Sequence, residues 1–339
     1  MSDLTSVRSR AAGTATVADS AELAVVARGD FIESRHAGSA VVLGQDATVL
    51  RELGDPSAPV FPRSALKPFQ ALAALSAGAE LDGAELAVAT ASHSGTAEHV
   101  EAVRGILARA RLPETALQCP PALPGDPEAR ASVSAAGAAP APVFMECSGK
   151  HAAMLLACVV NGWDPADYLA ADHPVQKHVV DTIERLTGEK VVATATDGCG
   201  APTHAITLTG LARGVQRIAT AQASSPFPLY KKAAAITGAV RAEPWAIAGP
   251  GRPDSVLAAS LGVFSKRGAE GVLVVAAPDG TTVALKVLDG SHRAAAITAL
   301  TLLVKAGALP AASVAAVLPE VVEPVLGGGV PVGEIRPVI

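Results

Sequence analysis

One serine and one lysine lie at a spacing that could support nucleophilic catalysis. Ser64 and Lys67 are three positions apart in Arg63–Gln70, so on a helical turn both side chains share one face. A lysine whose pKa is lowered by burial or by neighbouring cations can take the proton of a serine hydroxyl and so activate it. The alternative is a solvated lysine that follows a capping serine. Pro68 favours a tight or irregular first turn, because it disfavours helical geometry in the residue before it.

A second group of polar side chains follows a short apolar run. The segment Ala91–His99 holds two serines, Ser92 and Ser94, and two histidines, His93 and His99, directly after the run Glu85–Ala91. This placement predicts a site at the end of a buried strand. A turn rich in capping residues is the alternative, since serine and threonine are common at such positions.

Two cysteine–histidine pairs carry metal-ligand chemistry. Cys147 and His151 are four residues apart and would share a helix face, and Cys199 and His204 form a second pair. Thiolates with nitrogen donors suit zinc. The spacing matches no common zinc-finger pattern, so two buried free cysteines remain the alternative.

The elements that must position these residues are strands and helices in separate stretches. Apolar runs predict one hairpin near the N-terminus and another joined by Pro278-Asp279-Gly280. The predicted strands are Leu23–Ala27, Ser39–Gly44, Val191–Thr196, Val272–Ala276 and Thr282–Leu288, and the main predicted helices are Gln70–Ala77, His99–Arg109, His151–Asn161 and Pro174–Gly188. Hairpins that flank a helical middle predict an α+β fold, an antiparallel sheet covered by helices.

Composition sets limits on the class of protein. The 339 residues are 50% hydrophobic and 17% charged, which excludes a disordered chain. Mean hydropathy is +0.36, but the most apolar stretch, Ala294–Val317, is interrupted by Lys305, Gly307 and Pro310, so a membrane span is not expected. A net charge of −5 offers no footprint for nucleic acid. With no secretory signal in the sequence, we expect a cytoplasmic protein with reduced cysteines, in which a disordered tail (1–20) precedes a single catalytic domain (21–339).

The chain resembles the asparaginase II family, the rhizobial-type or class 3 L-asparaginases. The stretches that carry the resemblance are Arg63–Gln70, Ser92–His99, Cys147–Leu155, His173–Gln176, Thr196–Pro202 and Val332–Pro337. The resemblance implies a fold related to serine β-lactamases and penicillin-binding proteins, and hydrolysis of L-asparagine to L-aspartate and ammonia. It also implies a homodimer with zinc beside the catalytic serines.

The resemblance assigns roles to particular residues. The implied catalytic pairs are Ser64 with Lys67 and Ser92 with Lys266, and the implied zinc ligands are Cys147, Lys150 and Cys199. The expected substrate-binding residues are Arg63, His93, His151 and Asp197. Arg63 and the metal would hold the substrate's α-carboxylate, and Asp197 its α-ammonium group. Glu146 and Thr96 depart from the family pattern, in which Asn and Glu are common at these positions.

Two other functions remain open at this stage. One is another serine amidase or esterase of β-lactamase-like fold, which would carry a Lys-Thr-Gly motif on a late strand. Lys286 lies on the last predicted strand but is followed by Val287, so no such motif is expected. The other is a catalytically inactive homologue that only binds metal.

Overall fold

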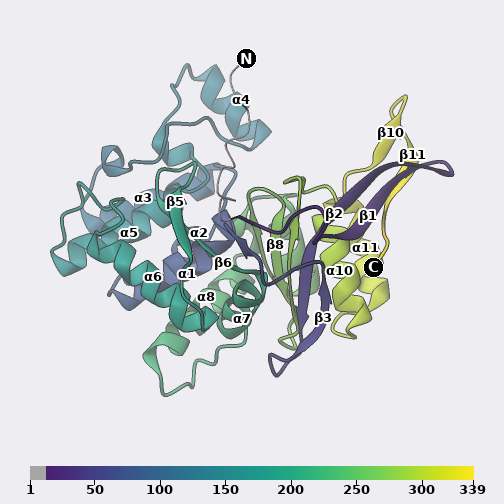
Figure 1. The fold of residues 1–339 in the computed structure, drawn as a ribbon. Helices are drawn as coiled ribbons and strands as arrows, with labels where there is room; N and C mark the ends of the chain where they lie inside the picture. Colours follow the sequence, from purple (N-terminus) through teal and green to yellow (C-terminus); the bar gives the residue numbers. More distant parts are fainter. Residues whose placement is uncertain (1–12) are drawn as a thin grey trace, which may run out of the picture.

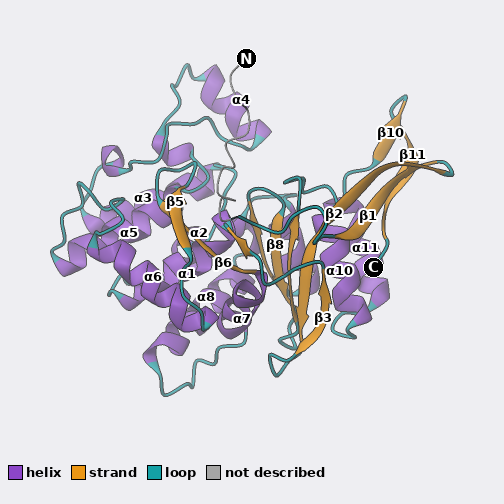
Figure 2. Ribbon diagram, viewed as in Figure 1, coloured by secondary structure: helices purple, strands orange, loops and turns teal. Residues whose placement is uncertain are grey.

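An antiparallel sheet forms the frame of the protein. The structure is a computed structural model that describes residues 13–339. In this part of the chain the sheet has eight strands, all paired antiparallel, and Figure 2 shows them edge-on between helices. Its main path runs in the order β10 (Val325–Gly327), β11 (Val330–Pro337), β1 (Ala21–Arg28), β2 (Phe31–Leu43), β9 (Thr282–Val287), β8 (Val272–Ala276) and β7 (Phe264–Gly268), and β3 (Val49–Leu53) pairs with β2.

The central strands are apolar on both faces, so the sheet separates two cores. Along β8, Val272 and Val274 belong to one core, whereas Leu273 and Val275 belong to the other. This follows from the alternation of side chains along a strand. Each face therefore needs its own cover of helices.

Helices cover the sheet on its two faces. On the first face α7 packs against β2, β8 and β9, with a larger group of helices beyond it (Figure 1). The helices of this larger group, α7 included, are α1 (Lys67–Ser76), α2 (Gly83–Ala89), α3 (Ala97–Ala110), α4 (Pro127–Ala135), α5 (Ser148–Asn161), α6 (Pro174–Thr187), α7 (Leu208–Ala219) and α8 (Pro228–Ala242). On the second face α10 (Ala295–Lys305) packs against β8, β9 and β11, and α9 (Pro253–Leu261) packs against β7 and α11 (Ala311–Val321).

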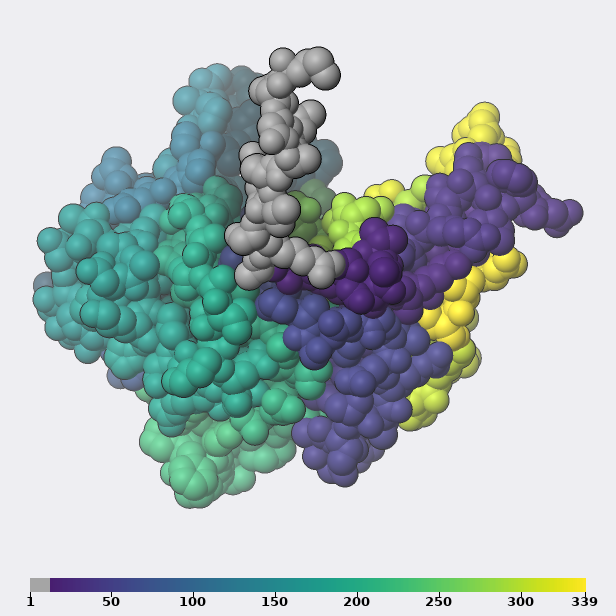
Figure 3. Space-filling model, in the orientation of Figure 1, coloured from purple at the N-terminus to yellow at the C-terminus, as the bar shows by residue number. Residues whose placement is uncertain are grey.

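Smaller elements complete the helical part. A second sheet has the order β4 (Pro59–Val60), β6 (Pro202–Thr207) and β5 (Ala193–Thr196). Within residues 13–339 the single-turn 3₁₀ helices are η1 (Arg63–Leu66), η2 (Glu114–Ala116), η3 (Pro142–Phe144) and η4 (Pro244–Ile247). The tips of β1–β2 and β10–β11 project together from the body, in purple and yellow in Figure 3.

The predicted α+β class is confirmed, with an antiparallel sheet and helices on both of its faces. The prediction for Glu85–Ala91 is wrong, because this run lies in α2 and the loop that follows, not in a strand. Leu86 to Ala89 are all buried, and a run buried on every side has no periodicity that separates a helix from a strand. The loose stretch Pro120–Pro142 is mostly loop, as expected, but contains α4.

The predicted N-terminal tail is described only in part. Residues 1–12 lie outside the described residues, and a turn closed by a Thr16–Asp19 hydrogen bond leads into β1. Among the helices of residues 13–339, none is long and apolar enough to cross a membrane.

Candidate active site

The Ser92 hydroxyl lies between two buried lysines. Lys67 Nζ and Lys266 Nζ are each 2.9 Å from Ser92 Oγ. Both lysine side chains are fully buried. Each ammonium also has one backbone acceptor: Lys67 Nζ lies 3.3 Å from the Glu146 carbonyl oxygen and Lys266 Nζ lies 3.0 Å from that of Arg267. The two lysines, 199 positions apart in sequence, therefore converge on a single hydroxyl.

Three different elements bring these side chains together. Lys67 is the first residue of α1, directly after the 3₁₀ turn η1, so the turn before Pro68 is irregular as expected. Ser92 follows α2, where the Ser92 amide donates to the Ile247 carbonyl oxygen at 3.0 Å. Lys266 lies on β7 opposite Val274, on the face of the sheet that meets the larger group of helices.

Asp254 orients Lys266 and opposes the effect of burial on it. Burial lowers the pKa of Lys266 to about 8, while the Asp254 carboxylate, 3.8 Å from Nζ, acts to raise it and the charge of Lys67 acts to lower it further. Asp254 is itself held by the Ser265 hydroxyl at 2.7 Å and the Arg267 amide at 3.0 Å. A serine, a lysine with a lowered pKa and an orienting carboxylate are the parts that a general-base mechanism needs.

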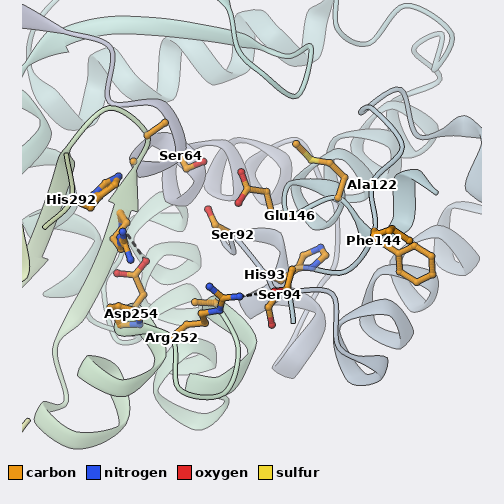
Figure 4. Close-up of a pocket in the computed structure, with 18 residues that line it drawn as sticks. Ser64, Ser92, His93, Ser94, Ala122, Phe144, Glu146, Arg252, Asp254 and His292 are labelled. Carbon is orange, nitrogen blue, oxygen red and sulfur yellow. Dashed lines mark hydrogen bonds between the residues drawn. The ribbon is translucent and has the colours of Figure 1, made fainter. Parts of the chain in front are cut away.

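Ser64 opens onto the same pocket as Ser92. The pocket has a volume of about 560 Å³, and Figure 4 shows Ser64, Ser92 and Glu146 close together, with Arg252 and Asp254 along another wall. Among the described residues no hydrogen bond joins the side chains of Ser64 and Lys67, and the Lys67 amine is directed to Ser92 instead. The structure thus brings the four predicted catalytic residues to one place, with both lysines on Ser92.

The turn that carries Ser64 is pressed against strand β7. A Cβ on Gly268 would lie 1.9 Å from the Pro62 carbonyl oxygen, so only glycine allows this approach. Arg63, between Pro62 and Ser64, has a φ of 53°, a left-handed conformation that is costly for a residue with a side chain. Close packing and a strained residue together fix η1 beside Lys266.

Arg63 and Asp197 form an ion pair beside this turn. Arg63 Nε lies 2.6 Å from Asp197 Oδ1, and Asp197 Oδ2 lies 4.0 Å from Lys150 Nζ. Burial acts to raise the pKa of Asp197, but the charges of Lys150 and Arg63 outweigh it and lower this pKa below its ordinary value. Neither Arg63 nor Asp197 lines the pocket that holds the serines.

The three predicted zinc ligands lie together. Cys147 caps the N-terminus of α5, Lys150 lies within its first turn, and Cys199 lies between β5 and β6. A hydrogen bond from Cys199 lowers the pKa of Cys147 to about 5, against the effect of burial, and the same pairing raises the pKa of Cys199. Although burial opposes the charge of Lys150, the two cysteines and Asp197 raise its pKa.

This donor set is compatible with zinc. The thiolate is the form of cysteine that binds metal, and Cys147 is the thiol whose pKa is lowered. The third donor is an amine, and no group of three or more His, Cys, Asp and Glu side chains is arranged for a metal in residues 13–339. A metal at Cys147, Lys150 and Cys199 would therefore have to displace the proton of Lys150.

His93 lies on the pocket wall with its proton position fixed by hydrogen bonds. The Ser148 hydroxyl donates to the Val143 carbonyl oxygen at 2.9 Å, so it accepts from His93 Nε2 at 2.8 Å. This leaves Nδ1 as a buried acceptor that has no protein partner among the described residues. Burial, helped by the charges of His99 and Lys67, holds the pKa of His93 well below its ordinary value.

His151 is held in the interior rather than at the pocket surface. The Tyr168 hydroxyl accepts from the Gln118 amide at 3.1 Å and donates to His151 Nδ1 at 2.7 Å. His151 Nε2 is a buried donor with no partner in the described part of the chain. Burial, and then the charges of Lys150 and Lys67, keep the pKa of His151 well below its ordinary value.

The sequence predicts Lys266 as a catalytic residue, but it does not indicate Asp254, and the likeness of Lys266-Arg267-Gly268 to a Lys-Thr-Gly motif was not predicted. Asp254 stands at the start of a helix after Pro253, with no sequence neighbour that marks it as functional. The three-residue motif differs from Lys-Thr-Gly only in its middle residue and lies on an edge strand. A search for a lysine two positions before a glycine at a strand end, rather than for the full motif, would have found this likeness.

The fold and the site together define a serine–lysine centre on an α+β scaffold. The chain belongs to the L-asparaginase II family, whose model matches residues 24–337. No curated protein sequence matches the chain.

Several solved structures resemble the chain at low identity. A structure of Mglu in its glutamate form has 13% identity and a TM-score of 0.47 and covers 80% of this chain, which spans 61% of that protein's length. A Bacillus glutaminase has 12% identity and a TM-score of 0.45, over 80% of this chain and 91% of its own. A β-lactamase from Mycobacterium bovis has 16% identity and a TM-score of 0.39, and the match covers 84% of this chain and 94% of the β-lactamase.

Proposed function

We propose that the protein hydrolyses the side-chain amide of L-asparagine to L-aspartate and ammonia through an acyl-enzyme. The observation that carries this proposal is the Ser92 hydroxyl held at 2.9 Å by two buried lysines in a pocket that also holds Ser64. Family membership supplies the reaction class, since the family is that of L-asparaginase II.

In this mechanism Ser92 is the nucleophile and Lys266 its base. Lys266, with a pKa of about 8, is neutral in a sizeable fraction of molecules near neutral pH. The neutral amine of Lys266 takes the proton from Ser92 Oγ as this oxygen attacks the side-chain amide carbon of the substrate. The Lys67 ammonium stabilises Ser92 Oγ by donating a hydrogen bond to it. The C–N bond then breaks, the nitrogen receives the proton held by Lys266, and ammonia leaves. Water attacks the ester in the same way, releases aspartate and returns the proton to Ser92.

Ser64 and Lys67 form the second serine–lysine pair of the proposal. Both belong to the η1–α1 segment, and Lys67 already contacts Ser92. A small movement of Lys67 would let it exchange protons with Ser64, and catalytic hydrogen bonds are often longer before substrate binds. We therefore assign Ser64 a proton-relay role.

The substrate's charged groups are assigned to residues around the centre. The Arg63–Asp197 pair presents both signs of charge, which matches the carboxylate and ammonium of an amino acid. His93 Nδ1 is a buried acceptor at the pocket wall and suits an N–H donor of the substrate. His151, held by Tyr168 in the interior, would reach the substrate only through its Nε2, which has no partner among the described residues.

Zinc is the metal that Cys147, Lys150 and Cys199 would hold. When bound, it would supply a positive charge beside the reaction centre and would favour anionic groups there. The lowered pKa of Cys147 supports this assignment. Metal content measured on purified protein tests it: one zinc per chain is expected, and Cys199→Ser should reduce that content strongly.

The decisive experiment combines ammonia release with mass spectrometry of the trapped acyl-enzyme. L-asparagine should release ammonia faster than L-glutamine, and the added aspartyl mass should map to the peptide that contains Ser92. Acylation of Ser64 instead would exchange the two serine roles. No ammonia from asparagine, glutamine or simple esters, with zinc bound, would favour a metal-binding homologue without activity. The predicted homodimer is tested separately, by the molar mass of the protein in solution.

A further inference from the structure

A second cavity adjoins the reaction centre at the β7 edge of the sheet, and Arg252, Pro253, Asp254, Arg267 and His292 line both cavities. Its volume is about 540 Å³, and it is enclosed by the starts of α9 and α10, the end of α11 and strand β7. Arg267 is the β7 residue directly after Lys266, and it pairs with Leu273 of the second core. Because side chains alternate along a strand, Lys266 and Arg267 point to opposite faces, one toward Ser92 and one toward this cavity.

Charged side chains of both signs line this second cavity without pairing. The guanidinium groups of Arg267 and Arg293 make no hydrogen bond or ion pair with any residue that the structure describes, and the same holds for the carboxylates of Glu320 and Glu323. Arg252, the third arginine of the wall, donates to the Gly125 carbonyl oxygen at 2.6 Å. Within residues 13–339 the cavity thus presents two unpaired arginines and two unpaired glutamates, the glutamates exposed to solvent, together with the buried carboxylate of Asp254, which contacts Lys266.

The helix ends around this cavity have a similar separation of charge, except that Asp254 lies in the first turn of α9. The starts of α9 and α10 both line it, and neither has a side chain that caps its free N–H groups. Helix starts favour carboxylates. On the other side α11 ends near Glu320, and a helix end favours a cation. The arginines lie at the helix starts and on β7, and the glutamates at or just after the end of α11.

We propose that this second cavity binds a free α-amino acid with an aliphatic side chain. The carboxylate would bind Arg267 and Arg293 beside the starts of α9 and α10, and the ammonium group would bind Glu320 and Glu323. The ligand's side chain would contact Leu257, Leu273, Val321 and Val322, the apolar part of a lining that also holds polar Ser291, His292 and Asp254. An inorganic anion would satisfy only half of this wall, because the two carboxylates would repel it.

Occupation of the second cavity would reach the reaction centre through shared residues. Asp254 and Arg267 line both cavities. The Arg267 amide donates to Asp254, and the Arg267 carbonyl oxygen accepts from Lys266. A ligand that binds the Arg267 guanidinium would therefore shift the groups that orient Lys266. The binding itself does not depend on the proposed asparaginase activity.

Calorimetric titration of the full-length protein with L-leucine tests the proposal. We expect one site per chain and at least a tenfold weaker affinity in Arg293→Gln and in Glu323→Gln, which line only the second cavity. The matched controls are Arg336→Gln and Glu334→Gln, an exposed pair on β11, which should bind as the wild type does. Circular dichroism and thermal midpoints establish that all four variants fold.

Two related ligands make the test specific. 4-Methylpentanoate carries only the carboxylate of leucine and 3-methylbutylamine only the amine, so each should bind at least tenfold more weakly. No leucine binding, equal binding of either half-ligand, or affinity unchanged in both cavity variants would each overturn the proposal. Where ammonia release is measurable, leucine should also move the pH at which the rate is half-maximal.

Discussion

Replacing Asp254 by asparagine should shift the pH dependence of the reaction. Burial lowers the pKa of Lys266 to about 8 from an ordinary 10.5. At pH 7 this makes about one lysine in ten neutral, instead of about one in three thousand, a difference worth about 3 kcal/mol. If neutral Lys266 is the base, kcat/KM of the wild type rises with pH and is half-maximal near pH 8.

The Asp254 carboxylate acts to raise the pKa of Lys266, so replacing it with a neutral amide should lower that pKa further. The carboxylate lies 3.8 Å from Lys266 Nζ. At that distance two unit charges interact by about 4 kcal/mol when the effective dielectric constant is about 20, and 1.36 kcal/mol equals one pH unit. Asp254→Asn should therefore move the rising part of the profile to lower pH by roughly one to three units. The asparagine oxygen can still accept from Ser265 or from the Arg267 amide, which limits the loss of stability to about 1–3 kcal/mol.

The assay is ammonia release from L-asparagine between pH 5 and pH 9. Asp289→Asn is the matched control, because Asp289 is a largely exposed carboxylate that lies 4.0 Å from the imidazole of His36 and does not line the pocket that holds Ser92. Its profile should equal that of the wild type. A shift of the Asp254→Asn profile to higher pH, or a wild-type rate that falls as pH rises through 8, would refute the role of Lys266 as a neutral base.

Three further changes test other parts of the structure. Gly268→Ala should reduce kcat by about a hundredfold or more while circular dichroism stays unchanged, because the new Cβ would push η1 and the Pro62 carbonyl oxygen away from β7. Arg63→Met should lower the free energy of unfolding by about 1–3 kcal/mol at pH 7, since it leaves Asp197 with one fewer cation. The pKa of Asp197 is lowered in the folded state, so its pairing stabilises the protein at pH values above the ordinary pKa of 3.8. This contribution is lost as the pH falls through the folded-state pKa of Asp197. In urea titrations the difference in free energy of unfolding between the variant and the wild type should therefore be smaller at pH 3 than at pH 7. Prolonged dialysis against a chelator should remove zinc and lower the thermal midpoint if Cys147 is a ligand, whereas an unchanged metal content and midpoint would contradict a metal site there.

The wrong strand prediction and the unpredicted strand have opposite causes. Glu85–Ala91 is apolar enough for a strand, but its length and burial suit a helix equally well, and packing against α5 and α8 decided the outcome. Phe264–Gly268 is too polar to predict a strand, since three of its five residues are Ser, Lys and Arg. It is a strand because β8 offers it a partner, and strand preference depends strongly on such context.

The assignment of lysines to serines also needed the tertiary structure. The spacing of Ser64 and Lys67 predicts that they interact, and spacing along one segment says nothing of a hydroxyl 25 residues further on. The structure directs Lys67 to Ser92 and the Glu146 carbonyl oxygen. The second lysine at Ser92 is Lys266, which comes from β7. Its position depends on the register of β7 against β8, and sequence patterns did not fix that register.

The sequence by itself determined the candidate site residues and the α+β fold class. It supplied the family motifs, the cysteines and the lysine close to them, and the alternating and apolar runs that make an antiparallel sheet between helices, because these depend on local spacing. Only the tertiary structure decided that two lysines share one serine, that Asp254 tunes one of them, and that Arg267 faces a second cavity. Those facts depend on contacts between residues far apart in the chain, and such contacts are set by how the sheet and helices pack.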